Sequence, residues 1–332
     1  ESRLEDKLMD MAHRGLVLDV RQGEKRFFTL TPVVIGFFEF TFMRARDNLD
    51  MKELATLFDQ YMKQDDSFAK SVFGESTQIG RTMVNENAIS LEDHTEIMDW
   101  ERASAVIKEA SCISVALCSC RHKALHQGKA CEAPMDNCLT LNYAAEALIR
   151  SGIAREISVD QALTILEQAR EHHLVQTGDN VKRNLTYICN CCSCCCGMIS
   201  AIRTFDIRGA IVSSNFIAEL DLQSCTGCAK CAKVCPVDAI TIHQEESEES
   251  APGKKKKPMK KWAVLEQDLC LGCGVCHSVC NKEAITMVRR DPVVFTPDSL
   301  FDRLIHMAIE RGKLADLIFE NPDKLSQKGL YK

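Results

Sequence analysis

Hydrophobic residues in the first third of the chain recur at spacings that predict two helices and a hairpin. Residues 4–14 carry apolar side chains at helical spacing, and residues 16–20 and 26–30 have the composition of two short strands joined by a polar turn. Residues 51–62 again have a helical pattern. We expect the core-facing side of this second helix to carry Leu54, Leu57, Phe58 and Tyr61.

The middle of the chain mixes short strands with helices. Residues 97–110 are predicted to be helical, and residues 113–117 form an apolar strand that leads into the first cysteines. Ser158 and Gln161 have the spacing of a capping box, in which each side chain binds the backbone N–H of the other residue. They predict a helix that runs to about His173.

The last part of the chain has the pattern of a helix with one apolar face. We expect Thr296 to cap this helix, Pro297 to lie in its first turn and Gly312 to interrupt it before residues 314–319. Such a face must be covered by the rest of this chain or by a partner subunit. Its members are Leu300, Phe301, Leu304, Ile305, Ala308 and Ile309.

Cysteine sets this composition apart from that of an ordinary globular protein. The chain has 332 residues, of which 45 % are hydrophobic and 27 % charged, but 19 are cysteines. Clustered cysteines in so long a chain indicate metal thiolate sites rather than a disulfide scaffold. Their positions predict four regions: a cysteine-free region over 1–110, a cysteine-rich domain over 111–205, a second cysteine domain over 206–295 and a helical tail over 296–332.

The N-terminal helix and hairpin resemble the wing of a winged-helix domain. This resemblance implies DNA binding, with a protein-docking or purely structural module as the alternative. The net charge of −6 gives the chain no overall basic field, so we favour the alternative and expect no nucleic acid partner.

A four-cysteine motif occurs twice, at Cys225 and again at Cys270, each time with the spacing C-x2-C-x2-C-x3-C. Over residues 214–290 the chain resembles the two-cluster bacterial ferredoxins. In that family, three cysteines of one motif share a [4Fe–4S] cluster with the last cysteine of the other. The resemblance implies one cluster on Cys225, Cys228, Cys231 and Cys280, and a second on Cys270, Cys273, Cys276 and Cys235.

The two motifs differ in the residue after their last cysteine. Pro236 stands there in the first motif, as in the family, whereas Asn281 takes the place of the second proline, which affects the local turn rather than ligation. Zinc is the alternative metal, but a four-cysteine run with a three-residue final gap fits paired zinc knuckles poorly. Between the motifs, residues 244–261 contain glutamates and then lysines, which predicts a mobile surface loop that either docks a redox partner or is simply solvated.

Eleven further cysteines lie upstream of the repeat. Six of them fall within residues 189–196, where thiolates would repel one another and oxidise without a metal. They can supply eight ligands for two more [4Fe–4S] clusters, with three cysteines left over, and a composite site that draws on both groups is the main alternative. We assign one cluster to Cys118, Cys120, Cys131 and Cys138, and the other to Cys189, Cys192, Cys195 and Cys196, with Cys191, Cys194 and Cys112 as alternates.

The middle cysteines also carry a resemblance. The sequence from Cys118-Ser-Cys-Arg to the CNCCSCCC run at 189–196 resembles an arrangement found upstream of dicluster ferredoxin domains in ferredoxin-type proteins of anaerobes. It is loosely similar to the CCG motifs of heterodisulfide-reductase-like subunits, which bind non-cubane clusters, but the spacing differs.

We therefore predict an α+β multidomain protein. Its parts are a mainly helical, winged-helix-like first region, a cysteine-rich α+β middle domain, and a ferredoxin-like 2[4Fe–4S] domain with a helical tail. The sequence shows no dinucleotide fingerprint, no P-loop and no apolar run of roughly 18 residues. A cytoplasmic location is expected.

The predicted function is electron transfer. The chain would relay single low-potential electrons between redox partners of an oxidoreductase complex, one of them a flavoprotein or another oxidoreductase subunit. It would use two [4Fe–4S] clusters in the ferredoxin domain and three or four in total. One alternative is an enzyme that reduces a substrate at an unusual cluster on residues 189–196, and a weaker one is a redox-sensing DNA-binding regulator.

Overall fold

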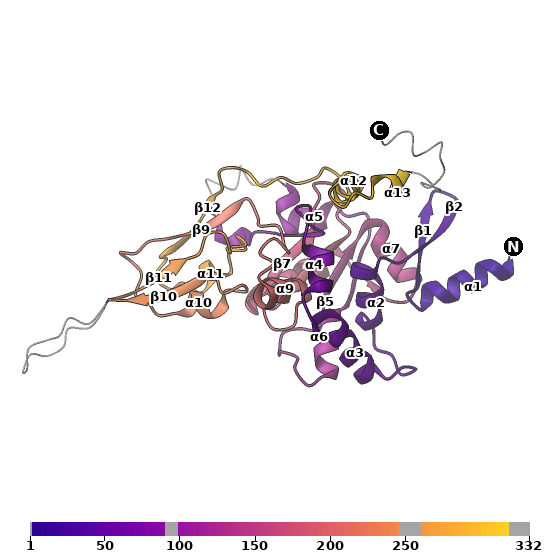
Figure 1. Cartoon of the computed structure of the whole chain (residues 1–332), viewed down its shortest axis with the longest axis horizontal. Helices are drawn as coiled ribbons and strands as arrows, with labels where there is room; N and C mark the ends of the chain where they lie inside the picture. Colours follow the sequence, from indigo (N-terminus) through magenta and orange to yellow (C-terminus); the bar gives the residue numbers. More distant parts are fainter. Residues whose placement is uncertain (1, 90–98, 246–259, 319–332) are drawn as a thin grey trace, which may run out of the picture.

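The computed structural model describes residues 2–89, 99–245 and 260–318. Figure 1 shows an elongated molecule with a large sheet and its helices in the centre. A small unit of two two-stranded sheets lies at one end, and the N-terminal helix and hairpin lie at the other. This mixture of helix and sheet confirms the predicted α+β class.

The N-terminal segment adopts the predicted helix and hairpin. Helix α1 (Ser2–His13) is followed by the antiparallel strands β1 (Val17–Gln22) and β2 (Lys25–Leu30). The secondary structure is therefore as predicted, while the resemblance to a winged-helix domain stays a prediction.

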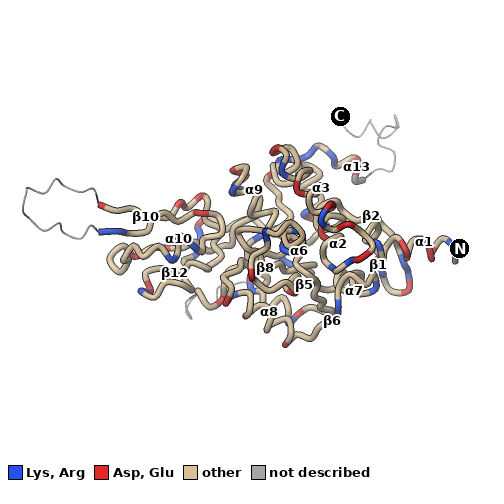
Figure 2. Tube along the Cα trace, turned by 90° about the horizontal axis from the view of Figure 1, so that it is seen from below, with Lys and Arg blue, Asp and Glu red and all other residues tan. Residues whose placement is uncertain are grey.

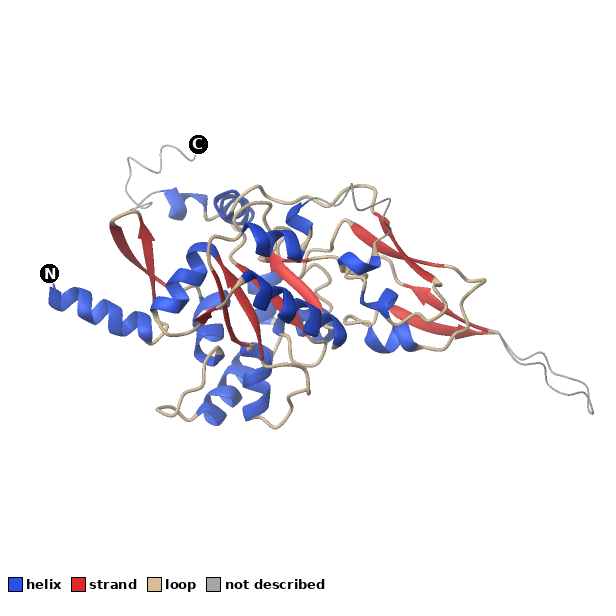
Figure 3. Cartoon of the chain, turned by 180° about the vertical axis from the view of Figure 1, so that it is seen from behind, coloured by secondary structure: helices blue, strands red, loops and turns tan. Residues whose placement is uncertain are grey.

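The centre of the molecule is an antiparallel sheet of six strands, seen between helices in Figure 3. Each strand is antiparallel to its neighbours, and the predicted strand over residues 113–117 is one of the inner ones. In spatial order the strands are β3 (Gly80–Thr82), β7 (Val175–Asp179), β8 (Tyr187–Cys191), β5 (Asp136–Leu141), β4 (Ile113–Leu117) and β6 (Arg155–Glu156).

One face of the sheet packs against helices α5 (Ala103–Glu109) and α8 (Val159–Glu171), and this contact forms a hydrophobic core. The predicted capping box begins α8. Gln161 N–H donates to Ser158 Oγ at 3.2 Å, and Ser158 N–H donates to Gln161 Oε1 at 3.0 Å. The helix ends two residues before the predicted position.

The predicted helix over residues 97–110 is shorter than expected. Residues 97 and 98 lie outside the described part, a single turn covers Asp99–Glu101, and α5 begins at Ala103. Both β3 and α5 precede residue 110 yet pack with elements that come after it. The predicted boundary at 110 therefore does not separate these elements, and the rest of the domain division stays a prediction.

The other face of the sheet packs against helices from several parts of the chain. They include three that belong to the cysteine-rich segment and two that come from the cysteine-free segment. These helices are α2 (Phe38–Phe42), α4 (Ser67–Phe73), α6 (Ser119–His126), α7 (Asn142–Arg150) and α9 (Gly197–Phe205).

Helix α3 (Met51–Lys63) lies where predicted, but its burial differs from the expectation. Met51 and Ala55 are buried, whereas Leu57 and Tyr61 are 51 % and 64 % exposed. The prediction that both belong to the core is wrong, because the helix contacts the rest of the chain through a narrower face than its apolar pattern suggests.

The repeated motif folds into two similar halves, which we call the repeat unit (residues 216–289). Each half contains a strand, a cysteine loop with a short helix, and a second strand; β9 pairs with β12 and β10 with β11. Most of the predicted charged insertion, residues 246–259, lies outside the described residues. The elements are β9 (Phe216–Leu220), α10 (Lys230–Val234), β10 (Ile240–Gln244), β11 (Lys261–Leu265), α11 (Val275–Ser278) and β12 (Ile285–Arg289).

The tail forms helices α12 (Leu300–Glu310) and α13 (Leu314–Ile318). The prediction that Thr296 caps the tail is wrong. Ser299 caps α12 instead, because its Oγ accepts a hydrogen bond from the Asp302 N–H at 3.3 Å.

Polar contacts, not the predicted apolar face, attach the tail to its own chain. The buried Arg303 donates to Asp179 Oδ1 at 2.8 Å, and Glu310 accepts a hydrogen bond from the Thr77 N–H at 2.9 Å. Phe301 and Ile309 of the predicted face remain exposed. Among the described helices, none combines the length and hydrophobicity that crossing a bilayer requires.

Candidate metal centres

The repeat unit holds its eight cysteines in two sets of four. In each set three cysteines come from one motif and the fourth from the other, as the ferredoxin resemblance implies. The first site is a cavity of about 180 Å³ lined by Cys225, Cys228, Cys231 and Cys280. The second is a cavity of about 20 Å³ lined by Cys235, Cys270, Cys273 and Cys276. Ligation by these residues stays a prediction.

Two glycines let the cysteine loops approach the neighbouring backbone. Gly227 and Gly272 hold equivalent positions in the two motifs, with φ of +64° and +68°. A Cβ on Gly272 would lie 2.0 Å from the carbonyl oxygen of Phe216, and one on Gly227 would lie 2.6 Å from the carbonyl carbon of Lys261. Only glycine combines this conformation with so little space.

The surroundings of the sulfur atoms fit ligands of an iron–sulfur cluster. The Ala239 N–H donates to Cys235 Sγ at 3.2 Å, and the Ala263 N–H donates to Cys225 Sγ at 3.4 Å. Such N–H···S contacts favour a negatively charged sulfur. Burial raises the pKa of Cys273 to about 12, so this thiol keeps its proton until a metal ion replaces it.

Eight cysteines of the middle region line one cavity of about 140 Å³. We call six of them the sulfur ring: Cys118, Cys120, Cys138, Cys189, Cys191 and Cys196. The other two are Cys192 and Cys195. Successive members interact around the ring, because Cys189 and Cys196 both contact Cys191, Cys138 contacts Cys189 and Cys120 contacts Cys196. Cys118 closes the ring through its electrostatic interaction with Cys120 and Cys138.

The alternation of side chains along two strands determines where three of the six ring cysteines lie. Leu139 of β5 and Ile188 of β8 face the core under α5 and α8. Neighbouring residues on a strand point to opposite faces, so Cys138, Cys189 and Cys191 face the other side together. The pairing of β5 with β8 brings the two strands side by side.

Two helix starts place the other half of the ring. Cys118 and Cys196 are the N-cap residues of α6 and α9, and Cys120 lies in the first turn of α6. Unpaired N–H groups and the positive end of the helix dipole favour thiolates at such positions. Burial is the largest cause that raises the pKa of Cys118, and the hydrogen bond from the Arg121 N–H opposes that rise.

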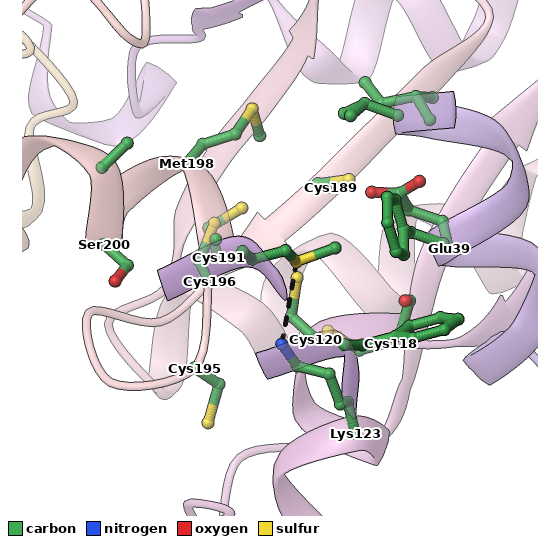
Figure 4. A pocket seen from close by; sticks show the side chains of 18 of the residues that line it. Glu39, Cys118, Cys120, Lys123, Cys189, Cys191, Cys195, Cys196, Met198 and Ser200 are labelled. Atoms are coloured by element: carbon green, nitrogen blue, oxygen red, sulfur yellow. Dashed lines mark hydrogen bonds between the residues drawn. The ribbon is translucent and has the colours of Figure 1, made fainter. Parts of the chain in front are cut away.

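Four other cysteines form a second, tighter group, which we call the sulfur tetrad. Figure 4 shows the labelled ring cysteines around the cavity, with the Cys195 sulfur pointing away from them. The four Sγ atoms of the tetrad all lie within 4.8 Å of one another. Its members are Cys131, Cys192, Cys194 and Cys195.

The two groups differ from the predicted assignment. Cys131 lies with the tetrad rather than with Cys118, Cys120 and Cys138, and the run over 189–196 is divided between the tetrad and the ring. The fold thus groups these cysteines as in the composite alternative, because it brings the loop after α6 against the turn after β8. Which of them bind a cluster stays a prediction. Cys112 joins neither group; burial chiefly raises its pKa, and nearby carboxylates add to this.

The thiols of the two groups cannot all ionise without a metal. Hydrogen bonds from Cys189 and Cys196 lower the pKa of Cys191 to about 6, while the corresponding interaction with Cys196 raises the pKa of Cys120. In the tetrad, the hydrogen bond from Cys195 lowers the pKa of Cys192 to about 4. One thiolate in each group thus keeps the neighbouring thiols protonated, and a bound metal ion would displace their protons.

The cavity inside the ring has an apolar wall that sequence reasoning missed. Phe38, Phe58 and Phe73, from α2, α3 and α4, line it together with Glu39. Desolvation raises the pKa of Glu39 even though the Gly36 N–H donates to it at 3.1 Å. The available signal was this single carboxylate within an apolar stretch of the chain.

Comparison with known proteins identifies the repeat unit alone. Residues 224–290 match the family model of the 4Fe-4S dicluster domain, which covers both four-cysteine motifs. No curated protein and no solved structure matches the chain. The match and the grouped cysteines support 4Fe–4S clusters and a role in iron–sulfur electron transfer.

Proposed function

We propose that this chain is an iron–sulfur electron-transfer protein or subunit in which the two sites of the repeat unit continue into a third at the sulfur ring. One hydrophobic core supports this proposal, because it reaches from the ring to the second site. Cys191 and Cys196 of the ring belong to this core, as do Leu271 and Val275 beside the second motif. Cys273 of the second site packs against it.

A further core joins the two sites within the repeat unit. Its buried members include Cys231 of the first site and Cys276 of the second, and Cys280 packs against it. The ring and both sites are thus linked in series through apolar contacts. Clusters of the [4Fe–4S] type, bound there, would supply one-electron chemistry with little change of geometry.

The chain's own residues hold the sulfur donors and leave two of the cysteines, Cys194 and Cys228, exposed. Cys228 of the first site is exposed, so we assign the first site to contact with a redox partner, a flavoprotein or another oxidoreductase subunit. All 19 cysteines are free, and we propose a reducing, cytoplasmic location on that basis. Figure 2 shows both signs of charge interspersed along the described chain, which gives the DNA-binding alternative no support.

A second candidate function is reduction of a small substrate at the ring. The ring offers six thiols where a cubane needs four, and the apolar cavity inside it has room of about 140 Å³ with Glu39 on its wall. A change in one electron paramagnetic resonance signal on addition of a small organic disulfide would favour this function. The same spectrum with and without the disulfide would favour the relay.

The test is a count of iron and acid-labile sulfide in protein purified without oxygen. We expect about twelve irons and about twelve sulfides per chain, four for each site. The triple variant Cys120→Ser/Cys191→Ser/Cys196→Ser, which leaves three ring cysteines, should contain about eight irons. Cys112→Ser, which changes a cysteine outside both groups, should contain as many as the native protein. Spectra of the dithionite-reduced protein should show the repeat-unit signals in all three.

Two results would contradict the relay. About eight irons in the native protein would confine clusters to the repeat unit and leave the ring without one. Protein that is colourless and magnetically silent after reduction would remove the electron-transfer role altogether.

A further inference from the structure

We propose that the sulfur tetrad is a separate mononuclear centre, which binds one divalent metal ion of the zinc type through four thiolates. The tetrad shares none of the six ring cysteines, although its Cys192 and Cys195 line the same cavity. This proposal therefore does not depend on a cluster at the ring.

The spacing of the sulfur atoms favours a single ion. A tetrahedral zinc ion with bonds of about 2.3 Å to sulfur sets its ligands about 3.8 Å apart. The four tetrad Sγ atoms all lie within 4.8 Å of one another, and those of Cys194 and Cys195 are 3.6 Å apart. A cubane binds each thiolate to a different iron, so its ligands must stand farther apart.

The repeat unit gives an internal standard for this argument. Its cysteines belong to a dicluster domain, yet no three of them are packed as closely as the tetrad. Among the described residues, the tetrad is the one group of cysteine, histidine or acidic side chains with this spacing. The same structure thus holds two different spacings of four cysteines, and the tetrad has the shorter.

A buried arginine supplies the second observation. Arg121 is fully buried, and it forms no ion pair with a carboxylate among the described residues. Its Nε donates to Cys131 Sγ at 3.4 Å, and its Nη1 donates to Pro134 O and to Asn137 Oδ1. A buried cation needs an anion nearby.

The tetrad provides that anion together with Cys118 of the ring, which also interacts electrostatically with Arg121. Four thiolates around one divalent ion carry a net charge of −2, and Arg121 offsets part of it. Arg121 also contacts Cys192, so it interacts with two of the four tetrad cysteines. Without the ion, the tetrad would offer the guanidinium a smaller counter-charge.

The position of the tetrad indicates a structural role. Cys131 lies in the loop between α6 and β5, while the other three lie in the turn between β8 and α9. Those two segments connect the elements that carry the ring cysteines. A metal ion at the tetrad would fix the loop to the turn, while the paired strands and the helix starts place the ring cysteines.

Metal analysis of the full chain, purified without oxygen, tests this proposal. Native protein should contain about one zinc ion per chain. The double variant Cys131→Ser/Cys194→Ser should lose that ion and keep its iron and sulfide. Cys112→Ser should keep all three. Loss of one iron without sulfide from the double variant would also support a mononuclear centre, with iron as the ion.

Loss of iron and sulfide together from the double variant would overturn the proposal, because it would assign a cluster to the tetrad. An unchanged metal content would overturn it as well. If the variant does not fold, X-ray absorption at the zinc edge of the native protein replaces it. Four sulfur neighbours at about 2.3 Å are expected, and absence of zinc, or nitrogen and oxygen neighbours, would contradict the centre.

Discussion

The repeat unit and the sulfur ring collect cysteines in opposite ways. In the repeat unit, each site takes three sulfurs from one short motif and the fourth from the copy of that motif. The ring takes its sulfurs from two strands and two helix starts spread between residues 118 and 196. A ligand set encoded within a motif can be read from the sequence, whereas one built by strand pairing depends on the fold.

The two regions also differ in how many sulfurs they offer. Each site in the repeat unit has four cysteines, which is the number that a cubane requires. The ring has six around a cavity that Cys192 and Cys195 of the tetrad also line. This difference implies that the repeat unit has no spare ligand while the ring has two.

The largest expected effect is on iron content, and it comes from this difference in the number of spare cysteines. Cys276→Ser should remove one to four irons from the second site, because no other cysteine lies in that cavity. Cys138→Ser should leave the iron content unchanged, because five ring cysteines remain for one cluster. Iron and sulfide analysis with spectra of the reduced protein measures both.

Equal losses from the two variants would contradict the comparison. They would show that no other ring cysteine can replace Cys138, and therefore that the ring has no spare ligand for this position. Alanine at the same two positions would check that the serine hydroxyl does not act as a substitute ligand.

A smaller effect, on the stability of the fold, is expected when a glycine in the backbone of the repeat unit is replaced. Gly272→Ala puts a side chain at a φ of +68° and 2.0 Å from the Phe216 carbonyl oxygen, so we expect destabilisation by more than about 2 kcal/mol. Gly209→Ala, outside the repeat unit, meets nothing within 4 Å and should change stability by less than about 0.5 kcal/mol. Thermal unfolding, measured without oxygen, compares the two variants. Equal midpoint temperatures would show that the loop around Gly272 accommodates a side chain at little cost in stability.

The sequence was most informative where the relevant contacts are local. The repeated motif, the capping box of Ser158 and Gln161 and the N-terminal helix and hairpin are each decided by residues a few positions apart. The position of Cys131 was not predictable in this way, because its neighbours come from a turn about sixty residues later.

Burial was also hard to predict from pattern alone. The apolar stripes that contain Tyr61 and Phe301 have helical spacing, but spacing does not say how much surface lies opposite. Arg303, which attaches the tail through Asp179, interrupts such a stripe and was not expected to be buried. The aromatic wall of the ring cavity was missed for the same reason, since it comes from the cysteine-free region.

The smallest effect concerns the end of the molecule farthest from the repeat unit, where an ion pair takes the place of sulfur (Figure 1). The buried Asp19 of β1 accepts hydrogen bonds from Arg26 at 2.8 Å and from Arg150 of α7 at 2.7 Å. The Arg26 contact chiefly lowers the pKa of Asp19 from 3.8 to about 2. Because the folded pKa is the lower one, the carboxylate stabilises the fold above pH 3.8, by about 2 kcal/mol, and loses this contribution as the pH falls towards 2.

Asp19→Asn should remove that pH dependence from hydrogen exchange of the hairpin, whereas Asp10→Asn, in an exposed pair with Arg14, should retain it. The same acid dependence in both variants would show that another group attaches the hairpin.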